Sequence, residues 1–276
     1  MSEQPDMATE PTAAETPAEP TAAETPAEPT AAEPTGPRNA DSWARPVDRL
    51  SAKDSEKGFD PTSVDGRRIA GPIQGFGKMW QKTYTVALAD ADVAPQQVIA
   101  DWKKHYGEFW PKGNRFQAPL AGLQPGEVGL ITGKAGGLKL STGVLVLYSD
   151  DESFSFMTPE GHPFAGMITF SAHGAAPTTA QVQLLIRAQD PMVELGMALG
   201  GHRKEDQMWI HTLTQLAHHF GVEEPAVDKQ VVCVDRKRQW RRAGNIRHDA
   251  VLHTMTRPFR RSPKPAADPD GDVKET

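Results

Sequence analysis

The sequence is almost free of cysteine, since Cys233 is the single cysteine among its 276 residues. No disulfide can therefore form within one chain, which fits a reducing compartment, and we expect a cytoplasmic protein. Long apolar runs are absent too. The best candidate, residues 192–199, contains Glu194 and falls short of the roughly 18–20 apolar residues that a membrane helix needs. We therefore expect no transmembrane segment, and we find no secretory signal pattern.

Several motifs of common enzyme classes are also missing. The glycine-rich stretch 133–137 lacks the hydroxyl residue of a phosphate-binding loop, and residues 71–77 precede a strand rather than follow one. The sequence has no Cys/His spacing of a zinc site, no Gly-x-Ser-x-Gly elbow and no His-Glu-x-x-His motif. These absences predict that the protein carries no metal and no cofactor.

Charge is distributed unevenly along the chain. Residues 1–40 hold eight acidic side chains against Arg38, whereas residues 235–264 hold ten basic side chains against Asp235 and Asp249. Between these two ends the balance is mildly acidic. Such segregation is typical of terminal segments that lie outside a globular core.

The N-terminal region is repetitive. The nonapeptide PTAAETPAE occupies residues 11–19 and 20–28, and it begins again at residues 29–33. Frequent proline and the lack of large apolar side chains predict a disordered tail over residues 1–66, serving either as a spacer or as a binding or phosphorylation segment. We expect a folded domain over 67–234, a partly helical basic extension over 235–262 and a second disordered tail over 263–276.

Alternating and helical patterns outline the domain. Residues 78–88 alternate as a half-buried strand, and apolar residues at helical spacing follow Pro95. Five further strands are expected at 128–132, 144–148, 154–157, 167–171 and 181–187. Asp190 and Pro191 resemble a helix cap and first turn, and a long helix should then run to Phe220. The order predicts an α+β fold, in which a curved antiparallel sheet wraps a long C-terminal helix.

This order of elements resembles the helix-grip superfamily, which includes START, birch-allergen and polyketide-cyclase-like proteins. Two shorter segments add to the resemblance. Residues 154–166, with Gly161, His162 and Gly166, resemble the central signature of an uncharacterised bacterial and plant domain family, although Met167 and Ile168 replace its acidic pair. Residues 208–221, 232–240 and 245–248 resemble actinobacterial hypothetical proteins. The resemblance implies an apolar cavity between sheet and helix.

Apolar side chains of the expected strands and helix are candidates to line such a cavity, or to fill an ordinary core. They are Trp80, Tyr84, Phe154, Phe156, Met167, Trp209 and Leu213. Gly196 and Gly200 either let the helix approach the sheet closely, which is the commoner use of such a pair, or bend the helix so that a cavity opens. Sequence alone leaves both questions open.

Histidines supply the candidate catalytic groups. His202 precedes Asp206 by four residues, so the two lie one helical turn apart, and a carboxylate can orient an imidazole as a general base. A structural hydrogen bond at the helix start is the alternative. His162 lies in a turn between strands, where its ring can serve chemistry or cap the backbone.

The basic stretch contains Arg236, Lys237, Arg238, Arg241 and Arg242, with Trp240 among them. It can bind phosphate groups of nucleic acid or anionic membrane weakly, or simply lie in solvent.

Three functions follow from these patterns. We favour a small-molecule binding protein for an apolar or amphipathic ligand. The alternatives are a cyclase- or hydrolase-like enzyme that uses a cavity histidine, and an interaction protein that uses the basic stretch.

Overall fold

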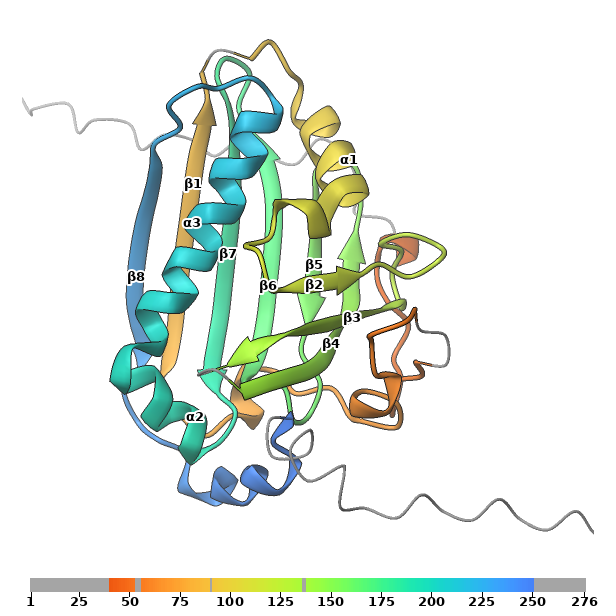
Figure 1. Cartoon of the computed structure of the whole chain (residues 1–276), viewed down its shortest axis with the longest axis vertical. Coiled ribbons are helices and arrows are strands. Elements are labelled where there is room, and N and C mark those ends of the chain that lie inside the picture. Colours follow the sequence, from red (N-terminus) through yellow and green to blue (C-terminus); the bar gives the residue numbers. More distant parts are fainter. Residues whose placement is uncertain (1–39, 53–55, 90, 136–137, 251–276) are drawn as a thin grey trace, which may run out of the picture. The chain divides into compact units, whose positions relative to one another are not determined.

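The structure is a computed structural model that describes residues 40–52, 56–89, 91–135 and 138–250 (Figure 1). The repeat segment and the end of the basic stretch lie outside the described residues. Residues 1–39 of the expected N-terminal tail and the expected tail over 263–276 lie outside them too.

A single antiparallel sheet of eight strands forms the body of the protein, in the order β2-β3-β4-β5-β6-β7-β1-β8. The strands are β1 (Met79–Leu88), β2 (Arg115–Gln117), β3 (Val128–Ala135), β4 (Leu138–Ser149), β5 (Ser153–Met157), β6 (Phe164–His173), β7 (Thr178–Ala188) and β8 (Val227–Asp235). Figure 1 shows β3 and β4 crossing obliquely to β1 and β7, so the sheet is strongly curved. Its inner face carries the helices.

Alternation along the central strands decides which face is covered. In β1, Tyr84, Val86 and Leu88 are buried, whereas Thr85 between them is half-buried and Ala87 is exposed. Tyr84 lies opposite Val182 of β7 and Lys229 of β8, and side chains of such partners share a face. The even-numbered residues of β1 and β7 therefore point toward the helices.

The helices pack on this inner face. They are α1 (Pro95–His105), followed by the 3₁₀ helix η4 (Tyr106–Phe109), and a long bent unit of α2 (Pro191–Gly196), a π turn (Met197–Gly201) and α3 (His202–His219). The Asp190 carboxylate accepts hydrogen bonds from the backbone N–H groups of Met192 and Val193, so it caps α2 as expected. Gly221, with φ of +87°, follows the end of α3.

The two helix-start glycines do not provide close packing. Nothing lies within 4 Å of a Cβ placed at Gly196 or at Gly200. Gly200 has φ of +109°, and the path of the helix breaks there. Gly200 therefore produces a bend, and neither glycine serves a close approach of helix and sheet, which corrects the preferred interpretation of the pair.

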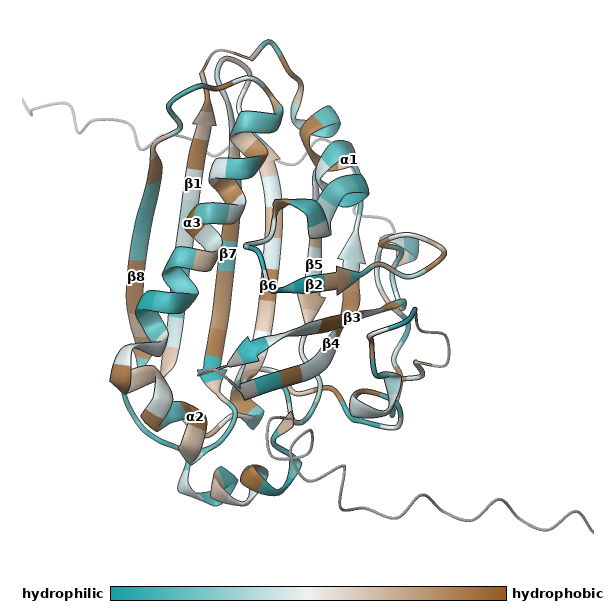
Figure 2. Ribbon diagram, viewed as in Figure 1, coloured by the Kyte–Doolittle hydropathy of each residue, from teal (hydrophilic) through white to brown (hydrophobic). Residues whose placement is uncertain are grey.

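Aromatic side chains fill the space between sheet and helices. Phe154, Phe156 and Phe170 of the sheet contact one another and the rings of Trp102 in α1 and Tyr106 in η4, with ring centroids 4.6–6.0 Å apart. Figure 2 shows hydrophobic residues along β5, β6 and β7, and hydrophilic residues along much of α3. The core thus lies under α1 and the inner side of α3.

The expected disorder up to residue 66 extends too far. Leu50, Ala52 and Val64 are buried against Leu130 of β3 and Leu145 of β4, where they form a second apolar cluster. Trp43 forms a bridge with Tyr148 of β4, and their ring centroids are 4.7 Å apart. The few apolar residues of this segment, spaced too irregularly to predict an element, hold it on the sheet.

The curved antiparallel sheet with a long helix along its inner face is the arrangement expected from the sequence. The six predicted strands and both predicted helices are present. The two edge strands, β2 and β8, were not expected from the sequence. No helix among the described residues is long and apolar enough to cross a membrane.

Candidate functional site

A buried lysine marks the candidate site. Lys82 occupies an inward-facing position of β1, between Trp80 and Tyr84, and is 1% exposed. An unpaired charge in such surroundings is very costly, so its partners define the local structure. Those partners come from the first two turns of α3.

Two carboxylates of α3 hold this lysine. Lys82 Nζ donates to Glu205 Oε2 and to Asp206 Oδ1, both at 2.8 Å. Tyr84 Oη donates to the same Asp206 oxygen at 2.6 Å, and Lys229 Nζ of β8 donates to Asp206 Oδ2 at 2.9 Å. Two ammonium groups and two carboxylates therefore balance in charge at the contact of β1, β8 and α3.

The network shifts the pKa values of its members. Burial by itself raises the pKa of Asp206, but hydrogen bonds from Lys82, Tyr84 and Lys229 outweigh it and lower this pKa to about 2. Burial, the hydrogen bond to Asp206 and the nearby carboxylate charges hold the pKa of Tyr84 well above its usual range. Asp206 is thus an anion, and Tyr84 is a neutral donor, at any physiological pH.

Two buried polar atoms of the site stay without a hydrogen bond among the described residues. They are Glu205 Oε1 and His202 Nδ1. His202 Nδ1 lies 3.9 Å from Glu205 Oε2, which is too long for a hydrogen bond. A buried carboxylate oxygen and a buried imidazole nitrogen of the same helix turn therefore lack hydrogen-bond partners among the described residues.

Solvent reaches one side of this network. The side chains of His202 and Lys229 are 34% and 40% exposed. Trp80 lies opposite Cys233, and Lys82 lies opposite Val231, so both β8 residues face α3. Because Val231 is still 42% exposed, α3 leaves this part of β8 uncovered. We call the surface formed by Trp80, His202, Lys229, Val231 and Cys233 the α3–β8 rim.

The structure gathers most of the predicted ligand-lining residues in one core. Tyr84, Phe154, Phe156, Trp209 and Leu213 belong to the main apolar cluster, and each is 5% exposed or less. Their rings and methyl groups pack on one another. At the centre of the interface these side chains therefore act as core.

Trp80 and Met167 lie apart from that core. The Trp80 ring contacts the His202 ring edge-on, with centroids 5.1 Å apart, so it belongs to the α3–β8 rim. Side chains alternate between the two faces along β6. Ile168 pairs with Phe156 and packs on the inner core, so the adjacent Met167 lies on the other face. Met167 thus points to the outer face of the sheet, which corrects its expected place in a cavity.

The predicted histidine candidates separate into two places. His202 and Asp206 share the Lys82 network, although Asp206 bonds to lysines and tyrosine rather than to the imidazole. His162 Nδ1 accepts a hydrogen bond from the backbone N–H of Phe164 at 3.0 Å. Burial lowers the pKa of His162 to about 4, so its ring is neutral and caps a turn.

The basic stretch follows β8 at the lower end of the view in Figure 1. Arg238 Nε donates to Glu194 Oε1 of α2 at 2.9 Å, whereas Arg236, Lys237 and Arg241 are exposed. Arg242 is half-buried. Five of the basic groups expected to bind polyanions thus lie on one segment, and one of them is paired within the fold.

Sequence reasoning missed Lys82, Glu205 and Lys229. A signal was present at Lys82, because a lysine interrupts the apolar side of an otherwise alternating strand. Its partners could not be read from the pattern, since Glu205 is 123 residues away. Within the described residues, no group of His, Cys, Asp and Glu side chains could hold a metal ion.

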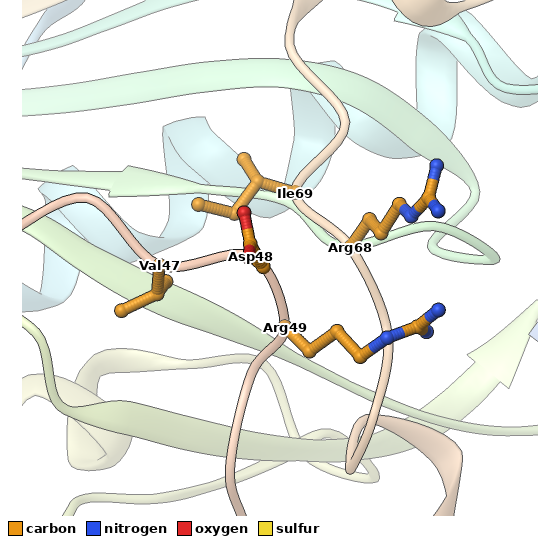
Figure 3. A pocket seen from close by; sticks show the side chains of 5 residues that line it. All are labelled: Val47, Asp48, Arg49, Arg68 and Ile69. Atoms are coloured by element: carbon orange, nitrogen blue, oxygen red, sulfur yellow. The ribbon is translucent and has the colours of Figure 1, made fainter.

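Two surface hollows lie elsewhere. One, of 520 Å³, is lined by Val47, Asp48, Arg49, Arg68 and Ile69, and Figure 3 shows both arginines extending to the same side. The other, of 310 Å³, is lined by residues of the segments 51–52, 117–121 and 127–128. Neither hollow includes a residue of α3, so neither is the cavity expected between sheet and helix.

Comparison with known proteins adds structural matches alone. No protein-family profile matches the chain, and no curated protein matches it. The di-domain ARO/CYC protein StfQ of the steffimycin biosynthetic pathway is 10% identical, with 52% of this chain and 50% of StfQ covered and a TM-score of 0.40. A START superfamily protein from Mycobacterium smegmatis is 21% identical, with 52% and 97% covered and a TM-score of 0.35.

The structure of Ara h 8.0201 is 11% identical, with 51% of this chain and 97% of that chain covered and a TM-score of 0.36. At these scores the matches carry no argument about function. The fold rests on the strand order and on the helix contacts described above. The strand order and the helix on the inner face give this chain the helix-grip fold, which is the fold of the superfamily that its sequence resembles.

Proposed function

We propose that this protein binds a small amphipathic molecule at the α3–β8 rim, and that the molecule carries a hydroxyl or amine group. The observation that carries the proposal is Glu205 Oε1, a buried carboxylate oxygen without a donor among the described residues. An unsatisfied buried polar atom costs about 1–3 kcal/mol. A ligand that donates a hydrogen bond to this oxygen recovers that energy.

The neighbouring groups suit such a ligand. His202 Nδ1 is a second unsatisfied atom beside Glu205, and its ring is partly open to solvent. Trp80, Val231 and Cys233 offer an apolar surface on the same side of the sheet. A polar head can therefore meet Glu205 and His202 while an apolar tail lies against β1 and β8.

We place the ligand at the rim because the centre of the interface is occupied. The aromatic side chains between sheet and helices are buried and touch one another. A cavity there would require several of them to move, which is unfavourable in a close-packed core.

Chain-length-matched probes test the proposal. Octylamine and octanol share a tail and donate hydrogen bonds, whereas octanoate has the same tail and a repelling carboxylate. We expect the first two to raise the melting temperature and octanoate to leave it unchanged. Glu205→Gln should weaken the effect of octylamine, whereas Glu108→Gln at an exposed site should not. Equal shifts from all three probes would contradict polar recognition at Glu205.

A catalytic role is the second candidate, favoured by the imidazole of His202 beside the carboxylate of Glu205. Native mass spectrometry of the purified full chain would identify a compound that co-purifies. If His202 acts as an acid or base, the wild type should convert that compound. The His202→Asn variant should bind the compound without converting it. Binding without conversion by both proteins would leave ligand binding as the function.

A further inference from the structure

The bent start of the long helix presents an apolar face to solvent. Met192, Leu195 and Leu199 are 48%, 60% and 79% exposed. Steps of three and four residues place them on one side of α2 and the π turn. The break at Gly200 follows directly, so this apolar side ends where α3 turns onto the sheet. Three large aliphatic side chains in a row are unusual on a surface that contacts nothing.

An exposed tryptophan lies at the same end of the molecule. Figure 1 shows α2 and the 3₁₀ helix η6 (Trp240–His248) together at the lower end of the view, and Figure 2 shows hydrophobic residues on α2. Glu194 of α2 forms an ion pair with Arg238, which lies two residues before η6. Trp240 is 75% exposed, and its ring contacts Phe76 with centroids 5.3 Å apart.

The charge around this apolar side has one sign. Residues 191–204 and 236–247 contain eight Lys and Arg side chains and a single carboxylate, that of Glu194. Arg238 neutralises Glu194, and Arg187 pairs with Asp235 at the end of β8. Besides Arg238, the exposed basic side chains of these two ranges are Arg203, Lys204, Arg236, Lys237, Arg241 and Arg247.

We propose that this end of the molecule docks on an anionic lipid bilayer, and we name it the α2–η6 surface. It consists of Met192, Leu195, Leu199 and Trp240 together with Arg203, Lys204, Arg236, Lys237 and Arg241. Aliphatic side chains enter the boundary between head groups and acyl chains, tryptophan prefers the interface, and basic side chains meet anionic head groups. The site is separate from the α3–β8 rim and does not depend on its ligand.

The aliphatic side chains distinguish this partner from nucleic acid. Arginines bind phosphates of either polyanion, and Trp240 can stack on a base. Leucine and methionine gain little from phosphates, whereas each buried leucine contributes substantially at a lipid surface. The combination of a basic surround with an aliphatic centre therefore favours a bilayer.

Vesicle sedimentation of the full chain tests the proposal. We expect binding to phosphatidylcholine vesicles that contain phosphatidylserine, little binding to phosphatidylcholine alone, and weaker binding as salt rises. Leu195→Ser/Leu199→Ser should weaken binding about tenfold or more, because two apolar insertions are lost. Leu120→Ser is the matched control, since Leu120 is 96% exposed and lies in the β2–β3 connection.

The basic groups are tested in the same assay. Arg236→Gln and Lys237→Gln should each weaken binding about fivefold, whereas the exposed Lys57→Gln and Lys112→Gln should not. Failure to bind anionic vesicles, or equal binding to neutral ones, would overturn the proposal. The proposal would also be overturned if the Leu195→Ser/Leu199→Ser variant bound anionic vesicles as tightly as the wild type does. Duplex DNA is the comparison ligand: tighter binding to DNA than to vesicles, unaffected by the leucine changes, would assign the surface to nucleic acid instead.

Discussion

Lys82 determines what the inner face of β1 can do. A lysine at this position, enclosed by Trp80, Tyr84 and α3, must be matched by carboxylates, and Glu205 and Asp206 supply them. The hydrogen bonds of Lys82 to Glu205 and Asp206 hold the first turns of α3 in one orientation against the sheet. It also leaves Glu205 Oε1 without a donor, so the structural ion pair and the proposed binding site share one residue.

Replacing this lysine should be strongly destabilising. Lys82→Ala leaves two carboxylates beneath α3 without their main counter-charge, and we expect a loss of about 3–5 kcal/mol in the free energy of unfolding. Urea denaturation at neutral pH measures it. Lys139→Ala on an exposed position of β4 is the control and should change stability by less than about 0.5 kcal/mol. Similar small losses for both variants would show that Lys82 is not held as described.

His162 should make stability sensitive to acid. Burial lowers its pKa to about 4 in the folded chain, whereas an unfolded histidine titrates near 6.5. The unfolded state therefore takes up the proton first as pH falls. His162 contributes a stability that is fully present above about pH 6.5 and is lost toward pH 4, by at most about 1.4 kcal/mol per pH unit.

The comparison of two proteins isolates this contribution. Unfolding by urea is measured for the wild type and for His162→Asn at several pH values between 4 and 7. Asparagine does not titrate, so the variant should lose less stability on acidification than the wild type. Parallel pH dependence in the two proteins would assign the titration to other groups.

At the scale of elements, the bent unit of α2, the π turn and α3 combines two tasks. Its second part carries Glu205 and Asp206 to Lys82, and its first part carries Leu195 and Leu199 into solvent. In a straight helix, the direction in which Leu195 and Leu199 point would also fix the direction of Glu205 and Asp206. The bend lets the two pairs of side chains point in independent directions. The bend at Gly200 separates the two faces.

The two glycines of this unit should respond in opposite ways to alanine. Gly200 has φ of +109°, which alanine adopts poorly, so Gly200→Ala should destabilise the protein by about 1–3 kcal/mol. Gly196 has φ of −59° and open space around it, so Gly196→Ala should be neutral or stabilise by up to about 1 kcal/mol. Thermal unfolding of both variants, measured side by side, checks this. Equal effects would mean that the bend does not depend on Gly200.

Periodicity explains which elements the sequence could predict. β1 alternates, and Asp190 caps a helical segment that begins at Pro191, so both appear where expected. β8 is an edge strand that is largely exposed on both faces, so its sequence does not alternate between apolar and polar residues. Its valines lie among Asp228, Lys229 and Gln230, and the strand was therefore not expected. The core residues were predictable from their hydrophobicity, but the Lys82 network joins β1 to α3 across more than a hundred residues, which no local pattern shows.

At the scale of the whole molecule, the segment before the expected domain belongs to the fold. Ala44 N–H donates to the backbone carbonyl of Leu147, and Leu50 exchanges backbone hydrogen bonds with Arg67 and Gly66. Its apolar residues cover an outer part of β3 and β4 that the helices do not reach. The sheet therefore has a helical cover on its inner face and an irregular cover over this second cluster.

Truncation separates this cover from the repeat segment. Removing residues 1–66 deletes Leu50, Ala52 and Val64 and exposes Leu130 and Leu145, which are 3% and 1% exposed in the intact chain. Since each fully buried leucine or valine contributes about 1.5–3 kcal/mol, we expect a loss of at least about 3 kcal/mol and a lower melting temperature. Removing residues 1–39 keeps every contact described and is the control. Both truncations remove the acidic repeat, so a difference in melting temperature between them reports on residues 40–66 alone. Equal melting temperatures would contradict the packing of residues 40–66 on the sheet.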